Sequence, residues 1–331
     1  MVLSLLRYKS YQWLPREREE NSCQFISSRG LLKSSHTKTK RPKSSSPKLD
    51  ADLLENHTAG ATIYITTDAL PLFVQTHLLH MREPFVLLSG DSDLPIEADR
   101  TLENTLSSNM LKTLLTHPLL VAWYAQNLAM EHEKLFNLPI GLDYHTLTAR
   151  KSHAWGEFQT PLEQEELLRS VAADASPLNE REMQGYCNWH HAAHRGDRAQ
   201  VLAVADDTVA YYENDHLPRE QSWRKNAQFL YTISPFGEGM DCHRTWEALF
   251  LGAVPIVKSS SLNPLFEGLP VLVVEDWSQV TVMRLEQEKQ SLLENTYDFS
   301  SLSLSHWTDK FAGREPKRLE PMTYQQFLDG L

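Results

Sequence analysis

The chain of 331 residues is poor in cysteine, with only Cys23, Cys187 and Cys242. None lies close enough to another in sequence to suggest a zinc-ligand pair or a disulfide framework, which argues against a structural metal. Long apolar runs are also missing. No stretch approaches the roughly 18 consecutive apolar residues of a membrane-spanning helix, and the initial MVLSLL is too short for the apolar core of a signal peptide. We therefore expect no transmembrane segment.

The low cysteine count is typical of a reducing compartment, so a cytoplasmic location is favoured for the chain as given. A Golgi lumenal location is the alternative if an N-terminal anchor is missing. The sequence leaves the choice open.

Basic residues are scarce outside the N-terminus. The first fifty residues hold 11 Lys and Arg against 4 Asp and Glu, which leaves 21 against 39 in the remaining 281. A body with this acidic excess is a poor match for nucleic acid or an anionic membrane, because attraction to phosphate chains needs a net basic surface. Any phosphate that this protein binds must meet a local group of donors.

Residues 1–55 have a composition of their own, rich in Ser and Lys in SSRGLLKSSHTKTKRPKSSSPK, and show no helical or strand periodicity. Such a composition predicts a disordered basic tail. From residue 61 onward, short apolar runs alternate with amphipathic stretches of helix length, which is typical of βα units around a parallel sheet.

This alternation predicts an α/β protein with two Rossmann-like, doubly wound domains that face a cleft. An N-terminal domain is expected over 56–160, a linker with a helix over 161–181, and a C-terminal domain over 182–331. In the first domain we expect strands near 61–66, 84–89 and 119–123, helices near 68–80 and 101–115, and a strand that ends in a loop within FNLPIGLDYHTL (136–147). In the second we expect strands near 183–189, 208–212, 228–234, 253–258 and 270–275.

A glycine-bearing junction, SPFGEGMDCHRTWEALFLGAVPIVK (234–258), joins two of the predicted strands. Gly237 and Gly239 would form a turn, and Asp241 would cap a helix that begins with Cys242. Free amides of such a turn and the N-terminus of the helix that follows are a seat for phosphate. Arg244 and Glu247 are three residues apart, so both side chains lie on one helix face near that seat. The alternative is an ordinary turn with a surface ion pair.

The run from Ser234 to Trp277 resembles the C-terminal nucleotide-sugar domain of exostosin-like glycosyltransferases, in which Ser-Pro, Gly-x-Gly, Arg, Glu and Gly-x-x-Pro occur in this order. The match is specific over about 182–280. Upstream, EPFVLLSGDSDLPI and FNLPIGLDYHTL are similar to the acceptor-side half of the same family. The resemblance implies the two-Rossmann (GT-B) arrangement and a hexosyl- or pentosyltransferase that moves a sugar from a nucleotide-diphosphate sugar to a hydroxyl of a glycan, lipid or protein, with inversion.

Donor-binding residues follow from the junction and from the resemblance. Arg224 and Lys225 are additional phosphate candidates. Three histidines at 190, 191 and 194 could bind a metal or remain solvated, and the two arginines beside them could contact phosphate. The candidate donor-binding residues are Ser234, Gly237, Gly239, Asp241, Arg244, Glu247, Arg195, Arg198, Ser259 and Ser260.

An acceptor hydroxyl needs a base, and strand-end loops of the first domain offer Asp91, Asp93, Asp143 and His145. Single-domain transferases hold Mn²⁺ or Mg²⁺ with an Asp-x-Asp pair like the one in GDSD. A metal at Asp91 and Asp93 is therefore the alternative to metal-independent transfer. The resemblance favours no required cofactor.

Two other classes remain as alternatives: another Rossmann-type nucleotide-binding enzyme, such as an oxidoreductase, and a non-catalytic carbohydrate-binding relative. The first predicts Gly-x-Gly-x-x-Gly directly after a first strand, and no such run follows residue 66 or residue 189. The joint presence of Gly237, Gly239, Arg244 and Glu247 argues against the second.

Overall fold

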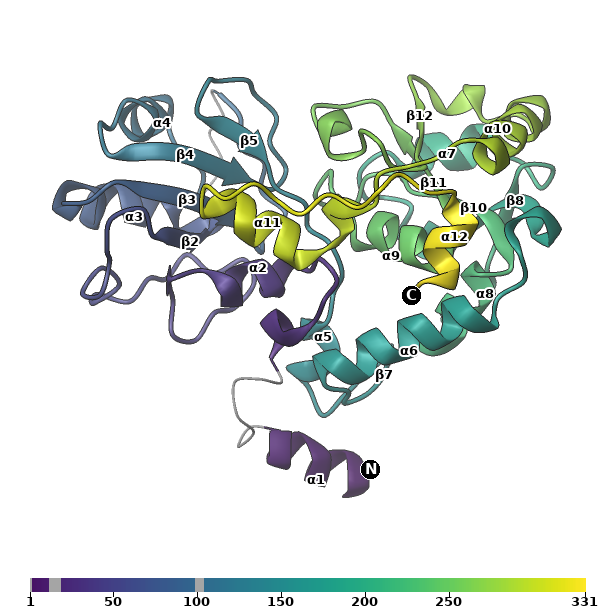
Figure 1. The fold of residues 1–331 in the computed structure, drawn as a ribbon, viewed down its shortest axis with the longest axis horizontal. Helices are drawn as coiled ribbons and strands as arrows, with labels where there is room; N and C mark the ends of the chain where they lie inside the picture. The colour runs from purple at the N-terminus through teal and green to yellow at the C-terminus, as the bar shows by residue number, and fades with distance from the viewer. Residues whose placement is uncertain (1, 12–18, 99–103) are drawn as a thin grey trace.

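The computed structural model describes residues 2–11, 19–98 and 104–331. The fold is α/β and is built on two five-stranded sheets (Figure 1). All neighbouring strands within each of these two sheets run parallel, as expected for strands linked by helical crossovers. A small antiparallel hairpin lies between the two in sequence. Within the described residues, no helix combines the length and apolarity needed to cross a membrane.

The N-terminal sheet has the strand order β1-β2-β3-β4-β5. Its central strands read TIYIT and FVLLSG and are buried along their whole length, because a parallel sheet is covered on both faces. The predicted strands near 61–66, 84–89 and 119–123 are confirmed. The five strands are β1 (Thr37–Lys38), β2 (Thr62–Thr66), β3 (Phe85–Gly90), β4 (Leu120–Ala125) and β5 (Leu135–Asn137).

Helices of the first part follow the predicted pattern with shifted ends. The helix expected near 68–80 consists of α3 between two 3₁₀ turns, and the one expected near 101–115 begins only after Ser107, whose side chain caps it. Residues 101–103 of that prediction lie outside the described residues. The helices here are α1 (Val2–Tyr11), α2 (Ser28–Ser34), α3 (Leu70–Thr76), α4 (Ser108–Leu115) and α5 (His145–Thr148).

The strand expected within 136–147 is shorter than predicted, since β5 ends at Asn137. Pro139 follows two residues later and lacks the N–H that a strand would need. Residues 138–144 instead run in irregular conformation toward α5. A hairpin of β6 (Ser152–His153) and β7 (Gly156–Glu157) follows, before the second sheet begins.

The C-terminal sheet has the order β12-β11-β10-β8-β9, and all five predicted strands are present in shortened form. Residues 161–174 form a helix as predicted, with a capping box between Thr160 and Glu163. The elements are α6 (Pro161–Asp174), β8 (Glu182–Cys187), α7 (Arg198–Val204), β9 (Ala210–Tyr212), α8 (Arg219–Asn226), β10 (Phe229–Ile233), α9 (His243–Leu251), β11 (Val254–Lys258), β12 (Leu272–Val274), α10 (Val282–Glu294), α11 (Leu304–Phe311) and α12 (Tyr324–Asp329).

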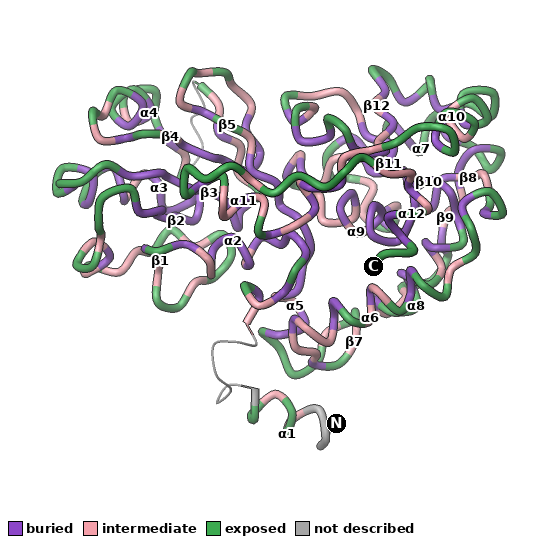
Figure 2. The backbone as a smooth tube through the Cα atoms, in the orientation of Figure 1, coloured by how far each residue is buried: buried purple, intermediate pink, exposed green. Residues whose placement is uncertain are grey.

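Residues 19–38 differ from the predicted disordered tail. They contain α2 and β1, and β1 pairs with β2 at the sheet edge. Ile26 and Leu31 are fully buried, and Figure 2 shows α2 beside the N-terminal sheet, with buried stretches in its backbone tube. The sequence predicted disorder for residues 1–55, and this prediction is wrong for residues 19–38. Residues 1 and 12–18 of that prediction lie outside the described residues.

Residues 19–38 are ordered because they help to cover the second face of the N-terminal sheet. Ile63, Ile65 and Leu87 point to one face, where α3 and α4 cover them. Tyr64 and Leu88 point to the other and join a larger core with Phe25 and the C-terminal sheet. The helices that cover this second face come from the two ends of the chain, α2 and α11, which also pack on each other (Figure 1).

Candidate functional site

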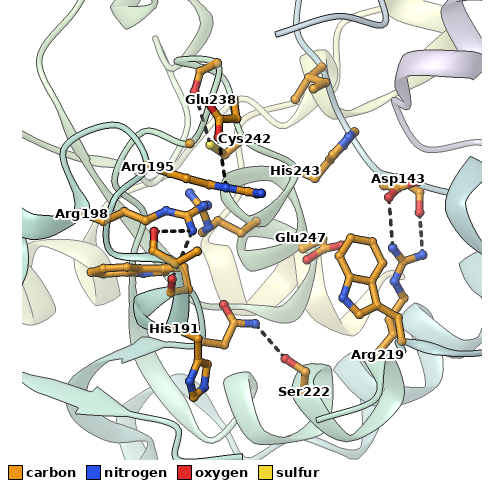
Figure 3. Close-up of a pocket in the computed structure, with 18 of the residues that line it drawn as sticks. Asp143, His191, Arg195, Arg198, Arg219, Ser222, Glu238, Cys242, His243 and Glu247 are labelled. Atoms are coloured by element: carbon orange, nitrogen blue, oxygen red, sulfur yellow. Dashed lines mark hydrogen bonds and ion pairs between the residues drawn. The ribbon is translucent and has the colours of Figure 1, made fainter. Parts of the chain in front are cut away.

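A cavity of about 630 Å³ lies between the two sheets. Its walls come from the loops that follow β3, β5, β8, β9 and β10, from the 152–157 hairpin and from the first turns of α8 and α9. Ligand sites of α/β proteins form where the carboxyl ends of parallel strands meet, and this cavity has that position. Figure 3 shows a basic side, with Arg195 and Arg198, and an opposite side, with Asp143 and Arg219.

Arg198 dominates the basic side. It begins α7 and is 7% exposed, and its Nη1 donates to the carbonyls of Trp189 at 3.1 Å and Ala192 at 3.4 Å. Its Nε has no hydrogen-bond partner, and no carboxylate pairs with it among the described residues. Burial, reinforced by the positive charge of Arg244, lowers the pKa of Arg198 to about 10. A buried cation without a counter-ion is unfavourable, so the site is suited to an anion.

Two further arginines line the same side. Arg244, in the first turn of α9, donates from Nη1 to the carbonyl of Pro235. Arg195 forms an exposed ion pair with Glu238 at 3.1 Å. The three guanidinium groups come from two separate loops, those after β8 and after β10. All three arginines are among the candidate donor-binding residues, and they line the same cavity.

The loop after β8 and the loop after β10 are tied together by Asp197 and Gly196. Asp197 accepts from the backbone N–H of Phe236 at 2.8 Å and from Nε1 of Trp277 at 2.7 Å. Gly196 has a φ of +51°, and a Cβ there would lie 2.5 Å from the carbonyl oxygen of Phe236. Only glycine permits this backbone conformation and this contact together. The arginines are thereby held at fixed positions relative to each other.

Gly237 and Gly239 line the cavity as predicted, but the Gly237 amide does not point at an empty space. Its N–H donates to the carbonyl of Gly239 at 2.9 Å, which closes the turn on itself. Gly239 has a different role, since a Cβ there would come within 2.9 Å of the side chain of Asn127, in the turn after β4. The hydrogen-bond donors that face the cavity therefore come from the arginine side chains more than from the Gly237 amide.

Asp241 does not cap α9, contrary to the prediction. The helix begins at His243 with Cys242 as its N-cap, and no side chain caps it. The buried Asp241 carboxylate accepts from the N–H of Ile140 at 2.7 Å and from Nε1 of Trp246 at 2.8 Å. Its own N–H donates to Asn127 at 2.9 Å. Asp241 thus connects the two halves, because a buried carboxylate needs donors and a neighbouring loop supplies them.

Glu247 lies one turn along α9 from Arg244 and also lines the cavity. No hydrogen bond or ion pair engages its carboxylate among the described residues, so the surface ion pair considered for Arg244 and Glu247 is absent there. Figure 3 places Glu247 between the basic side and the Asp143–Arg219 pair. It is an acceptor group free to meet a ligand.

Asp143 lines the cavity but is fully engaged. It lies 2.9 Å from Nδ1 of His145, 3.3 Å from Nη2 of Arg219 and 2.7 Å from Oγ1 of Thr146. Burial opposes the charge, but His145 and Arg219 outweigh burial and hold the pKa of Asp143 well below its usual range. Burial likewise opposes the charge on His145, and Asp143 raises the pKa of this imidazole. His145 lies behind Asp143 and outside the cavity wall. A carboxylate paired in this way is a weak base.

The two carboxylates of GDSD have different surroundings. Asp91 is buried, 3.2 Å from Nη2 of Arg29 and 2.7 Å from Oγ of Ser44, and it lies outside the cavity wall. Asp93 lies at the cavity rim, where partial burial and the charge of Glu238 raise its pKa. Among the residues that the structure describes, no three His, Cys, Asp or Glu side chains are grouped as metal ligands.

Three predicted donor residues lie away from the cavity. Ser234 is buried, and its hydroxyl pairs with Thr245 at 2.8 Å. Ser259 and Ser260 bond to the side chain of Asn263 at the start of a 3₁₀ turn. Of the two additional candidates, Arg224 pairs with Asp174 and Glu220 on the surface, and Lys225 lies over the ring of Tyr211.

Sequence reasoning missed an aromatic wall and a histidine. Trp155, Trp189 and Trp223 line the cavity, and the guanidinium of Arg219 lies 4.8 Å from the Trp155 ring centre. The sequence signal that could have indicated an aromatic cavity wall is the tryptophan beside a glycine in the short turn HAWGEF. His243 also lines the cavity, one residue before Arg244 in the junction itself.

The cavity therefore combines a buried arginine, Arg198, which has no carboxylate partner among the described residues, with the free carboxylate of Glu247 and with tryptophan side chains. A scan against protein-family models finds no match to this chain, and a search of curated proteins finds no significant match either.

Proposed function

We propose that this protein is a glycosyltransferase that moves a sugar from a nucleotide-diphosphate sugar to a hydroxyl acceptor. The observation that carries this proposal is the buried Arg198, which has no carboxylate partner among the described residues and lies in a cavity with Arg244 and Arg195. A diphosphate would supply the missing negative charge, and bidentate contacts suit guanidinium groups to phosphate oxygens.

The rest of the cavity supports a whole nucleotide sugar rather than phosphate alone. Glu247 has a free carboxylate one helical turn from Arg244, at a position suited to accept hydrogen bonds from ribose hydroxyls. Among the three tryptophans, Trp155 is 41% exposed and offers apolar ring surface for a base or a sugar ring. These positions match the order of residues for which the chain resembles exostosin-like transferases, and two parallel sheets around a cavity are compatible with their GT-B arrangement.

Sugar transfer breaks the bond between the anomeric carbon and the diphosphate oxygen. Negative charge then develops on the leaving diphosphate, and fixed cations at that point lower the barrier. Arg198 and Arg244 are held by backbone carbonyls and need little reorganisation to do this. The acceptor hydroxyl enters from the side of Asp93, and a single displacement inverts the anomeric centre.

A thermal-shift panel of nucleoside diphosphates tests the proposal, because a ligand bound only by the folded state stabilises it by about 2.7 kcal/mol at a concentration a hundredfold above Kd. We expect UDP or GDP to raise the midpoint. Arg244→Ala and Glu247→Ala should each remove most of this rise and leave the unliganded midpoint nearly unchanged, since both side chains face the cavity.

Arg224→Ala and Glu220→Ala are the matched controls, because these residues form an exposed ion pair on α8 away from the cavity. They should keep the full rise. Absence of any nucleotide effect on the unmutated protein, or a large fall in the unliganded midpoint of the cavity variants, would contradict the proposal. Binding of the diphosphate without release of nucleotide from any nucleotide sugar would instead identify a non-catalytic relative.

A further inference from the structure

Most groups that could accept a proton at the cavity are already engaged. Asp143 is held by His145, Arg219 and Thr146. His145 bonds back to Asp143 and does not line the cavity, and Asp91 is held by Arg29 and Ser44. On the N-terminal side of the cavity this leaves Asp93 at the rim. On the C-terminal side it leaves the Glu247 carboxylate and the imidazoles of His191, His216 and His243, and the orientation of the ring distinguishes His243.

His243 has a fixed orientation. Its Nδ1 lies 2.7 Å from the carbonyl oxygen of Gly141, which only accepts hydrogen bonds. Nδ1 therefore carries the hydrogen, and in the neutral ring the lone pair is on Nε2. Nε2 has no hydrogen-bond partner among the described residues, and the side chain lines the cavity directly beside Arg244.

The carbonyl that orients His243 is itself held in place. Gly141 has a φ of +62°, and a Cβ there would lie 2.5 Å from the carbonyl oxygen of Ile26. The next residue, Leu142, donates its N–H to the same oxygen at 2.9 Å. The N-terminal segment thus packs against Gly141, and Gly141 in turn orients the imidazole at the start of α9. An imidazole oriented by a backbone acceptor at the other nitrogen is the usual arrangement of a general base.

We propose that His243 is the general base of the transfer, an assignment that rests on the proposed function. Nε2 of His243 takes the proton of the acceptor hydroxyl as the acceptor oxygen forms its bond to the anomeric carbon. The bond from that carbon to the diphosphate oxygen breaks, and the leaving diphosphate keeps the electron pair beside Arg244 and Arg198. The proton passes from His243 to solvent after the product leaves.

Several charged groups surround the imidazole and set its response to pH. Asp93 faces it from the loop after β3, and Asp143 faces it from the segment before α5. The ring of His145 lies 6.1 Å away, and Arg244 follows on the same helix.

The test uses the full chain with a panel of UDP-sugars and GDP-sugars, and it measures release of the nucleoside diphosphate with water as the acceptor. His243→Asn keeps an N–H for Gly141 but has no basic nitrogen. We expect it to keep the nucleotide thermal shift and to lose about 10² to 10⁴ in rate. The unmutated rate should rise as the pH is raised, because a protonated base cannot take the proton of the acceptor, and this rise should vanish in His243→Asn.

Asp93→Asn is the comparison variant and should keep the pH-dependent rise. If His243→Asn keeps the rate and the rise, or if Asp93→Asn alone removes them, His243 is not the base, although the proposed function stands. If the unmutated protein neither binds nor releases nucleotide, the proposed function fails, and the base assignment fails with it.

A measurement on the unmutated protein covers the case in which His243→Asn does not fold. Carbethoxylation with diethyl pyrocarbonate, followed by peptide mass analysis, reports which imidazoles react. Loss of nucleotide release should follow modification of His243 and should reverse with hydroxylamine. Full activity after complete modification of His243 would overturn the assignment.

Discussion

The carboxylate of Asp241 is the clearest case in which one side chain joins the two halves of the molecule. It is buried, and it accepts from Ile140 on one side and from Trp246 on the other. Burial raises its pKa from the ordinary 3.8 to about 7, although the N–H donors around it act in the opposite direction. A group of this kind makes the stability of the folded state depend on pH.

The direction of this dependence follows from proton binding. The folded protein binds the Asp241 proton more tightly than the unfolded chain, so the contribution is full below about pH 4 and is lost as pH rises through about 7. We expect the difference in unfolding free energy between the parent and Asp241→Asn to change across this window. The variant should also be less stable by about 1–3 kcal/mol near pH 5, because its amide N–H₂ faces an N–H donor.

Urea titrations of both proteins at a series of pH values measure this difference. Asp143 provides an internal contrast, because its lowered pKa contributes stability that is lost as pH falls, and this contribution cancels in the comparison. A difference that stays constant from pH 4 to 8 would contradict the raised pKa of Asp241.

At the scale of the elements, the loop after β8 and the loop after β10 act as one unit. Gly196→Ala should separate them, since its Cβ would meet the Phe236 carbonyl at 2.5 Å. We expect a loss of about 1–3 kcal/mol in unfolding free energy and a weaker nucleotide effect on the thermal midpoint. Differential scanning calorimetry with and without UDP or GDP measures both.

Gly60→Ala is the matched control for this change. Gly60 also has a positive φ, +74°, but a Cβ there meets nothing within 4 Å. It should share the backbone strain and keep the full nucleotide effect. Equal loss of nucleotide binding in the two variants would show that the contact between the loops is unimportant.

The elements of both sheets were largely predictable because their signals are local. Runs such as TIYIT and FVLLSG can only be buried strands, and Thr160 with Glu163 marks a helix start within four residues. Arg244 and Glu247 were likewise predictable, since the junction places them at fixed spacing after a glycine turn.

Other features depend on contacts between distant residues. Asp241 looks like a helix cap in sequence, and only the approach of Ile140 shows its other role. Ser234 sits in the expected motif, but the neighbouring Thr245 takes its hydroxyl. Burial of Leu31 in a Ser- and Lys-rich segment follows from an uncovered sheet face, which no local pattern records.

At the scale of the whole molecule, the ends of the chain hold the two halves together. The Phe25 ring stacks on Phe250 with centroids 4.1 Å apart, and Arg169 lies over its other side at 4.1 Å. Ile26 donates its N–H to Leu302, and Leu304 donates to Gln24. Figure 1 shows the C-terminal chain passing beside the N-terminal sheet at α11 and returning to the C-terminal sheet at α12.

Phe25→Ala should therefore weaken both halves together. Phe→Ala changes in a core cost about 3–5 kcal/mol, and the loss here should appear as one cooperative transition at lower denaturant concentration. Tryptophan fluorescence and far-UV circular dichroism, followed in parallel, check this.

Phe136→Ala is the control, since this ring is 41% exposed and stacks on Tyr124 at the surface. It should shift the transition much less. Two separate transitions in Phe25→Ala, with only one of them shifted, would contradict a shared core.

The contact of Ile26 with Leu302 has a consequence for synthesis of the chain. The segment around Ile26 can meet Leu142 early, but it meets Leu302 only after residue 302 has been synthesised and has left the ribosome. Until then one face of the first sheet, including Tyr64 and Leu88, lacks the cover that α11 provides, and part of its apolar surface stays exposed. Many proteins complete their N-terminal domain early in translation. In this protein the contact between Ile26 and Leu302 forms late, so the N-terminal sheet is completed late.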